Sequence, residues 1–184
     1  MTRIIAGGAR GIRLAVPARG TRPTSDRVRE SLFAGLESAG ALDGARVLDL
    51  YAGSGALGLE ALSRGAASVD LVELSRPAAA IARDNIGRVE RSLGGSGLGR
   101  VHAVSADAFL RGSVATFDLV FLDPPYELGE ADLAATLALL APRRADDGLV
   151  VVERSRHSPQ PSWPAGIELA RERAYGDTVI WQAH

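Results

Sequence analysis

The most informative residues for chemistry form the tetrapeptide Asp123-Pro124-Pro125-Tyr126, which directly follows the apolar run Phe117–Leu122. The two prolines restrict the backbone and contribute carbonyl acceptors without N–H donors of their own. The Asp123 carboxylate and the Pro124 carbonyl can therefore both accept hydrogen bonds from one planar amino group, while Tyr126 offers a face on which a base can stack. The tetrapeptide indicates a site that holds a ring-bound amine; the alternative is a rigid turn with a packing tyrosine.

A second group of informative residues follows the apolar run Arg46–Leu50 and includes the carboxylate of Asp49. Three glycines come next with the spacing G-x-G-x-x-G, which lets the backbone approach a ligand closely and enter a helix without a steric clash. This spacing by itself leaves open a dinucleotide, another adenosine-containing ligand, or a tight strand–helix turn. The glycines are Gly53, Gly55 and Gly58.

Acidic residues end the next two predicted strands. Glu73 lies twenty residues after Gly53, the place where a carboxylate accepts hydrogen bonds from the ribose hydroxyls of an adenosine ligand. Asp107 can accept from the adenine amino group while a neighbouring backbone N–H donates to the ring, although a helix cap would explain it equally well. Together these acids predict an adenosine-containing cofactor bound across the ends of adjacent strands.

These residues require a scaffold that ends several strands at one edge. From Arg46 onward, apolar runs typical of buried strands alternate with runs typical of helices, which predicts a parallel α/β sheet covered on both faces. Ligands bind such a sheet at the carboxyl ends of its strands. The expected strands span Arg46–Leu50, Ser68–Glu73, Val101–Ser105, Phe117–Leu122 and Leu149–Glu153, and the expected helices span Leu57–Arg64, Arg76–Arg91 and Glu130–Leu140.

Both ends of the chain depart from this alternation. Ile167–Ala174 and Thr178–Trp181 flank a short glycine-containing turn, which predicts an antiparallel hairpin that completes the sheet. Arg3–Ala6 and Ile12–Val16 flank a glycine-rich turn and predict a small N-terminal β-hairpin. A helix over Asp26–Ser38 should follow, with capping residues immediately before it.

Charge is unevenly distributed along the chain, although the net charge is only −1. Residues 1–30 contain seven arginines and two acids, a net charge of +5, whereas the rest contains 14 arginines and 20 acids, a net charge of −6. This asymmetry predicts a basic arm that contacts nucleic acid, attached to a mildly acidic body. The alternative is an ordinary solvated strand face.

The composition of the 184 residues fits one soluble domain with a substantial core. The sequence has no cysteine, which excludes disulfides, thiolate metal sites and cysteine nucleophiles. The three histidines are scattered without metal-ligand spacing. No apolar run reaches the roughly 18 residues of a membrane span, and the N-terminus lacks a secretion signal. We therefore expect a cytoplasmic protein without a membrane segment or a metal site.

The motifs resemble those of a known class of enzymes, the class I S-adenosylmethionine-dependent methyltransferases. The resemblance covers roughly residues 46–126 and includes the acids, the glycines and the tetrapeptide in their order along the chain. A closer resemblance, spanning nearly the whole chain, is to the bacterial RsmD-type methyltransferases of small-subunit ribosomal RNA. It rests on Arg3–Gly7, Arg22–Phe33, Leu48–Ala61, Ser63–Ala66 and Phe121–Tyr126, among which the N-terminal blocks are the most specific.

This resemblance implies a Rossmann-like fold with a mostly parallel seven-stranded sheet, a C-terminal antiparallel hairpin, and a small N-terminal β-hairpin and helix. Residues 1–40 would form an RNA-binding extension, and residues 41–184 the domain that binds S-adenosylmethionine. The implied reaction is methylation of the exocyclic N2 of a guanine, conventionally numbered 966, in 16S rRNA of a partly assembled small subunit. The protein would act as a monomer.

The expected site residues fall into three groups. The catalytic group is Asp123, Pro124 and Tyr126. The cofactor-binding group is Asp49, Tyr51, Gly53, Gly55, Glu73, Leu74, Asp107 and Ala108. The substrate-binding group is Arg10, Arg13, Arg22, Thr24, Arg27 and Pro125.

Two alternative functions remain compatible with the sequence. A DNA adenine-N6 methyltransferase has a similar tetrapeptide, but it usually needs a region that reads duplex sequence, and here the residues after Tyr126 are used by the last helix and strands. A non-catalytic RNA-binding assembly factor could retain a degenerate cofactor site, which the intact acids disfavour. A protein glutamine methyltransferase is disfavoured because its tetrapeptide begins with Asn.

Overall fold

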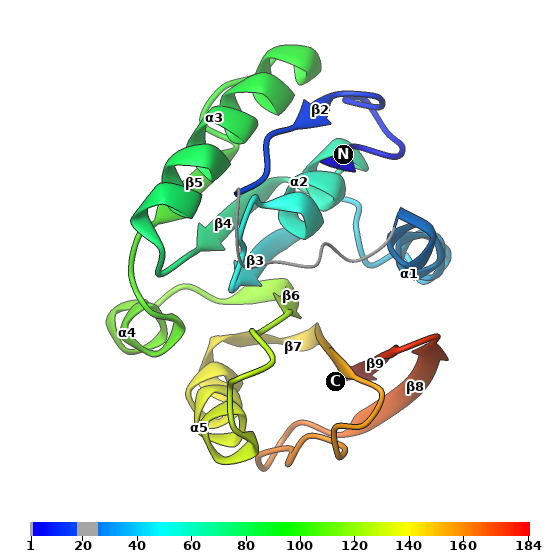
Figure 1. The fold of residues 1–184 in the computed structure, drawn as a ribbon, viewed down its shortest axis with the longest axis vertical. Coiled ribbons are helices and arrows are strands. Elements are labelled where there is room, and N and C mark those ends of the chain that lie inside the picture. The colour runs from blue at the N-terminus through cyan, green and yellow to red at the C-terminus, as the bar shows by residue number, and fades with distance from the viewer. Residues whose placement is uncertain (1, 18–25) are drawn as a thin grey trace.

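A computed structural model describes residues 2–17 and 26–184 of the chain. Its main feature is a seven-stranded sheet in the order β5-β4-β3-β6-β7-β9-β8, flanked by helices (Figure 1). The strands of this sheet are β3 (Arg46–Leu50), β4 (Ser68–Val72), β5 (Gly99–His102), β6 (Phe117–Leu122), β7 (Arg144–Ser155), β8 (Leu169–Tyr175) and β9 (Thr178–Ala183). The helices are α1 (Asp26–Ser38), α2 (Ala56–Ser63), α3 (Arg76–Leu93), α4 (Ala106–Gly112), α5 (Glu130–Leu140) and the 3-10 turn η1 (Ala141–Arg143).

The strand directions confirm the predicted topology. Strands β5, β4, β3, β6 and β7 are mutually parallel, and β9 pairs antiparallel with both β7 and β8. The chain passes from β3 outward to β5 and then returns to β6 on the other side of β3. The order therefore reverses between β3 and β6, where loops leave the sheet in opposite directions and open a crevice.

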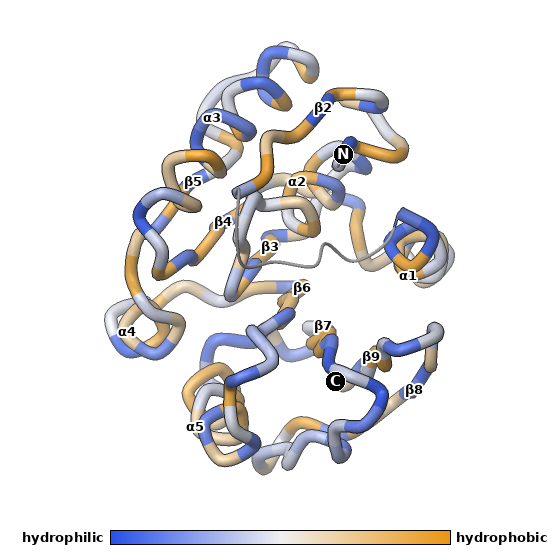
Figure 2. Tube along the Cα trace, in the orientation of Figure 1, coloured by the Kyte–Doolittle hydropathy of each residue, from blue (hydrophilic) through white to orange (hydrophobic). Residues whose placement is uncertain are grey.

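Side chains alternate along the strands and form two apolar layers. Val47 and Leu119 face α1, α2 and α3, whereas Leu48 and Val120 face α4 and α5. Figure 2 shows the corresponding hydrophobic segments along the central strands. Strands buried on both faces carry nearly continuous apolar runs, and for this reason the parallel sheet could be recognised from the sequence.

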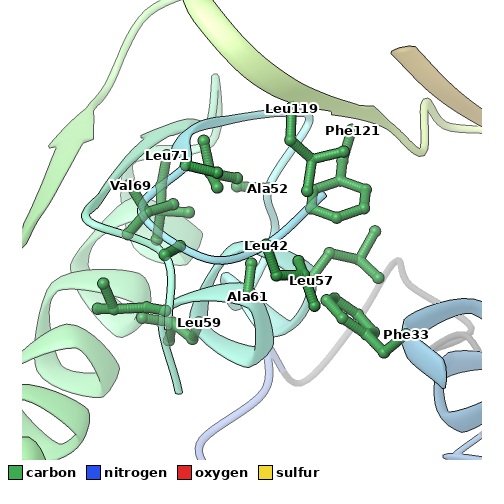
Figure 3. Close-up of a cluster of buried hydrophobic side chains, with 14 of the residues drawn as sticks. Phe33, Leu42, Ala52, Leu57, Leu59, Ala61, Val69, Leu71, Leu119 and Phe121 are labelled. Carbon is green, nitrogen blue, oxygen red and sulfur yellow. The ribbon is translucent and has the colours of Figure 1, made fainter. Parts of the chain in front are cut away.

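Helix α1 is anchored to the sheet by Phe33. Figure 3 shows this ring directed toward the cluster that includes Phe121 and Leu57, and the Phe33 and Phe121 ring centroids are 5.7 Å apart. All three side chains are buried. The helix after the N-terminal arm is thus part of the core that supports β6, the strand that leads into the tetrapeptide.

The N-terminal hairpin is confirmed, but its strands are shorter than expected. Only β1 (Thr2–Arg3) and β2 (Arg13–Leu14) pair as strands. The fully buried Glu60 of α2 accepts hydrogen bonds from the amides of Ile5 and Ala6, at 2.7 and 3.0 Å. These amides bond to a helix side chain instead of a partner strand, so the ladder ends early and the hairpin is fastened to α2.

The region between β5 and β6 departs most from the prediction. A strand over Val101–Ser105 was expected, whereas β5 ends at His102 and the unexpected helix α4 begins at Ala106. The Ser105 side chain caps this helix by accepting a hydrogen bond from the Ala108 amide. The seven-residue helix was missed because it is too short to show helical periodicity. The other boundaries shift by a few residues, except that β7 begins five residues earlier than expected. None of the described helices is long and apolar enough to cross a membrane.

Candidate active site

A cavity of about 880 Å³ opens at the carboxyl ends of β3, β4 and β6. Its position is that expected for ligand binding in an open α/β sheet. Ten of the predicted residues lie in its wall. They are Asp49, Tyr51, Gly53, Glu73, Leu74, Asp107, Asp123, Pro124, Pro125 and Tyr126.

Asp49 is a buried acid at the end of β3, with 1% of its surface exposed. Its Oδ2 accepts a hydrogen bond from the Gly58 amide at 2.9 Å. Burial raises the pKa of Asp49 to about 7, and the charges of Asp123 and Glu73 act in the same direction. The hydrogen bond from Gly58 acts in the opposite direction, but its effect is smaller than that of burial. A cation placed in the cavity would favour the ionised form of this carboxyl.

The glycine-rich turn requires its glycines for different reasons. Gly55 has φ of 82°, and a Cβ there would lie 2.6 Å from a Leu71 methyl group. A Cβ on Gly58 would lie 2.6 Å from side-chain atoms of Leu71 and Val69, so this glycine lets α2 pack closely on the sheet. Gly55 caps α2 behind the cavity wall, and only Gly53 of the three reaches the wall itself.

Glu73 fixes this turn from the end of β4. Its Oε2 accepts from the Gly53 amide at 2.8 Å, and its Oε1 accepts from the Ser75 amide at 2.7 Å. Each carboxylate oxygen has a second lone pair, so both can still accept from ribose hydroxyls. Glu73 therefore holds the glycine-rich turn in place as well as facing the cavity.

Asp107 and Tyr51 are connected by a residue that the sequence did not reveal, Thr136 of α5. The Thr136 hydroxyl donates to Asp107 Oδ1 at 2.8 Å, and its oxygen lies 3.3 Å from the Tyr51 hydroxyl. Because the Thr136 proton is used, the Tyr51 hydroxyl is the donor of the second bond. Burial raises the pKa of Tyr51, so its hydroxyl keeps the proton that this bond needs. Tyr51 also has φ of 64°, an uncommon conformation for a residue other than glycine.

The tetrapeptide leaves β6 and forms another part of the wall. Asp123 is half-buried and Pro124 is buried, whereas Pro125 and Tyr126 are exposed. Arg154 of β7 anchors the following turn: its Nη1 donates to the Pro125 carbonyl at 3.3 Å and its Nη2 to the Leu128 carbonyl at 2.7 Å.

Arg154 is also paired with Glu130 at 2.8 Å and is 7% exposed. It was missed because an arginine after an apolar strand reads as a surface residue. Its partners lie more than twenty residues away in the sequence, so no local pattern could indicate them.

Of the predicted substrate residues, Pro125 lies in the cavity wall, whereas none of the predicted arginines that the structure describes does. Arg10, Arg13 and Arg27 are exposed and do not line the cavity, and Arg22 and Thr24 lie outside the described residues. Among the described residues, the arginine in the wall is instead Arg29, which is 1% exposed. Of the predicted cofactor residues, Gly55 and the exposed Ala108 are also not part of the wall.

The Arg29 Nη2 atom donates to the Arg3 carbonyl and to Asp26 Oδ1, both at 2.8 Å. Arg29 thus joins β1, α1 and the cavity. No sequence signal separates it from the exposed arginines around it, because its burial depends on contacts with distant elements.

The carboxylates of the cavity wall fit S-adenosylmethionine better than NAD. Asp49, Glu73 and Asp123 are close enough for their charges to raise the pKa of Asp49. Such a concentration of negative charge favours a ligand with sulfonium and ammonium groups and opposes the pyrophosphate of a dinucleotide.

Comparison with known proteins bears out the resemblance seen in the motifs. The model of the family described as "Conserved hypothetical protein 95" matches residues 2–183. The chain belongs to this family. Its similarity to individual members extends over nearly the whole chain, including the N-terminal hairpin and the C-terminal strands.

One similar protein is "Ribosomal RNA small subunit methyltransferase D" of Escherichia coli, which is 41% identical over 96% of this chain and 86% of its own length. Another is "Putative rRNA methyltransferase YlbH" of Bacillus subtilis, at 35% identity over 97% of this chain and 96% of its own. Among solved structures, "Putative methyltransferase yhhF from Escherichia coli" gives a TM-score of 0.84 at 40% identity, covering 98% of this chain and 96% of that one. The Rossmann-like methyltransferase fold is thus established for this family member.

Proposed function

We propose that this protein transfers a methyl group from S-adenosylmethionine to the exocyclic N2 of a guanine in 16S rRNA, position 966 by family resemblance, during small-subunit assembly. The observation that supports this most directly is the shared cavity. The acceptors of Asp123-Pro124 lie in the same wall as the acids proposed to hold the cofactor. An amine and a methyl donor can therefore meet in one place.

The cofactor would bind across the ends of three strands. Glu73 would accept from its ribose hydroxyls, Asp107 from the adenine amino group, and the ionised Asp49 would lie near its cationic methionine end. Tyr51, Leu74 and Gly53 would form the contact surface around it, with Gly55 at the start of α2 and Ala108 in the first turn of α4 next to it. The Thr136 hydrogen bond to Asp107 leaves the other carboxylate oxygen available for adenine.

The cofactor supplies a methyl carbon made electrophilic by the attached sulfonium. The Asp123 carboxylate and the Pro124 carbonyl would accept the two hydrogens of the guanine amine, which favours a pyramidal nitrogen whose lone pair points at that carbon. The N–C bond would form as the S–C bond breaks, with the electron pair of that bond retained by the sulfur. Asp123 would stabilise the positive charge that develops on the nitrogen, and its carboxylate would accept the proton that the methylated amine must lose.

Tyr126 would hold the guanine by stacking, with Pro125 beside it. Its side chain is 64% exposed and belongs to the cavity wall. An exposed aromatic ring at the mouth of an acidic cavity is suited to receive an unstacked base. A guanine within a helix would have to be flipped out to reach it.

The substrate assignment rests on the names of the similar proteins and on the basic N-terminus. We propose that residues 1–40 form an RNA-binding extension and residues 41–184 the catalytic domain. Arg10, Arg13, Arg22, Thr24 and Arg27 would contact rRNA within a small subunit or assembly intermediate, and one monomer would suffice.

The test is to incubate the protein with labelled S-adenosylmethionine and small subunits, and then to map the modified nucleotide. One methylated guanine in 16S rRNA, lost in Asp123→Ala, is the expected result. Labelling of duplex DNA at adenine would instead support the DNA methyltransferase. Failure to bind the cofactor in calorimetry would indicate a non-catalytic assembly factor.

A further inference from the structure

A second, shallower depression lies where the N-terminal hairpin meets α3. Its lining consists of Ile12, Arg13, Arg88, Arg91 and Ser92. Arg88 Nη1 donates to the Arg13 carbonyl at 3.4 Å, and the Ser92 hydroxyl donates to the Gly8 carbonyl, also at 3.4 Å. Figure 1 shows β2 and α3 on the same side of the molecule. These contacts place guanidinium groups from two distant parts of the chain around one surface.

The arginines at this surface differ from those that hold the fold together. Arg46, Arg64 and Arg154 each lie within 3.0 Å of a carboxylate oxygen. By contrast, no ion pair with an acid is formed in the described parts of the chain by Arg13, Arg88 and Arg91, which line the depression. The same holds for Arg10, which lies in the hairpin turn two residues after Gly8, the acceptor of the Ser92 hydrogen bond. Residues 18–25, outside those parts, contain no acid, so none of their side chains can supply one.

The acid of α3 nearest in sequence to this surface is used elsewhere. Glu90 Oε1 accepts from the amides of Leu98 and Gly99, at 2.7 and 3.0 Å, where it secures the start of β5. Because Arg88 and Arg91 are three residues apart, their side chains emerge on the same side of the helix. The surface therefore presents several positive charges that the structure itself does not neutralise.

The basic surface is physically connected to the active site. Arg13 begins a segment whose residues Val16 and Pro17 line the catalytic cavity. At about 3.3 Å per extended residue, Pro17 lies no more than about 13 Å from Arg13 along the chain.

The segment is held in place by Asn85, which is fully buried one turn before Arg88. Its Oδ1 accepts from the Ala15 amide, and its Nδ2 donates to the carbonyls of Ala15 and Ser54, all at 2.9 Å. The basic surface, the Ala15 segment and the glycine-rich turn thus have a fixed mutual geometry.

We infer that Arg88 and Arg91 of α3 join Arg10 and Arg13 of the hairpin in one site that binds RNA phosphates beside the target nucleotide. Arginine suits this role because its planar fork donates two hydrogen bonds to one phosphate. The inference rests on the proposed function and extends the RNA surface beyond the N-terminal arm. It also explains how a protein with a net charge of −1 can bind RNA, which is strongly negative.

The test compares two double variants that remove the same charge. Arg88→Ala with Arg91→Ala removes the α3 part of the site, and Arg171→Ala with Arg173→Ala removes exposed arginines from β8 at the far edge of the sheet. Binding of the 16S rRNA segment around the target is measured between about 50 and 200 mM salt. Each lost phosphate contact should flatten the log–log salt slope by about 0.7 to 0.9, so the α3 variant should lose about 1.4 to 1.8 and the β8 variant almost nothing.

Arg10→Ala with Arg13→Ala should resemble the α3 variant, and the charge reversal Arg88→Glu with Arg91→Glu should weaken binding further. The melting temperature and the affinity for S-adenosylmethionine should stay close to those of the parent, because none of these side chains lines the catalytic cavity. An α3 variant that is folded and binds RNA with the parent's affinity and slope overturns the inference. A parent that binds RNA with this slope but methylates no small-subunit guanine contradicts only the proposed function.

Discussion

Asp49 should make cofactor binding depend on pH near neutrality. Burial, with Asp123 and Glu73 nearby, raises its pKa to about 7 in the ligand-free protein. If the cationic end of S-adenosylmethionine lies against the ionised Asp49 carboxylate, binding lowers the pKa of Asp49 toward the ordinary value of an aspartate. Below pH 7 the bound proton must first be released. The dissociation constant should therefore increase about tenfold per pH unit below 7 and level off above it.

Calorimetry from pH 5.5 to 8.5 measures this dependence. At pH 6, titrations in buffers of different ionisation enthalpy should show close to one proton released per cofactor, and at pH 8.5 almost none. Asp49→Asn can still accept from the Gly58 amide but cannot ionise. Its affinity for the cofactor should be lower than the parent's at pH 8. Its dissociation constant should lack the tenfold increase per pH unit that the parent shows below pH 7. An equal pH slope in parent and variant would refute this role of Asp49.

Asp49 should also make the free energy of unfolding of the ligand-free protein depend on pH. Its pKa is higher in the folded than in the unfolded chain, so the folded state binds the proton more tightly. The stability it contributes is present below about pH 4 and is lost as pH rises toward 7, by about 1.4 kcal/mol per unit. Asp49→Asn should remove this component, which denaturant titrations of parent and variant at pH 5 and pH 7 can detect by difference.

Substitutions at four further residues test the remaining groups of the site. Glu73→Ala should weaken cofactor binding by about tenfold or more in calorimetry, because two charge-assisted hydrogen bonds of roughly 1.5–3 kcal/mol each are lost; an unchanged affinity would remove Glu73 from the ribose site. Asp123→Ala should lower kcat by about a hundredfold to a thousandfold with little change in cofactor affinity, and near-normal turnover of this variant would contradict the mechanism. Tyr126→Phe should keep most activity, whereas Tyr126→Ala should lose it. Arg154→Ala should release the turn after Pro125 and reduce kcat/KM for RNA more than cofactor affinity, with partial rescue by Arg154→Lys; a variant that lost only thermal stability would show that the turn is held in place by other contacts.

The order of the predicted strands and helices and ten residues of the cavity wall follow from the sequence alone. Strands buried on both faces need continuous apolar runs, and the acids that end β3, β4 and β6 must lie at one edge once those strands are parallel. Asp49, Glu73 and Asp123 could therefore be assigned to one site from their positions after the apolar runs. The N-terminal arginines could likewise be recognised as an unusual concentration of charge.

Tertiary contacts, by contrast, determine which polar residues support that site and which remain available to a ligand. Arginines of identical chemistry became a core residue at Arg29, an anchor of the catalytic turn at Arg154 and part of an exposed basic surface at Arg88. Helix α4 escaped detection because its seven residues are too few to show helical periodicity. The roles of these arginines depend on contacts between residues far apart in the chain. Burying a charged group costs free energy unless the fold supplies a partner for it, and only the tertiary structure shows which partner each arginine has.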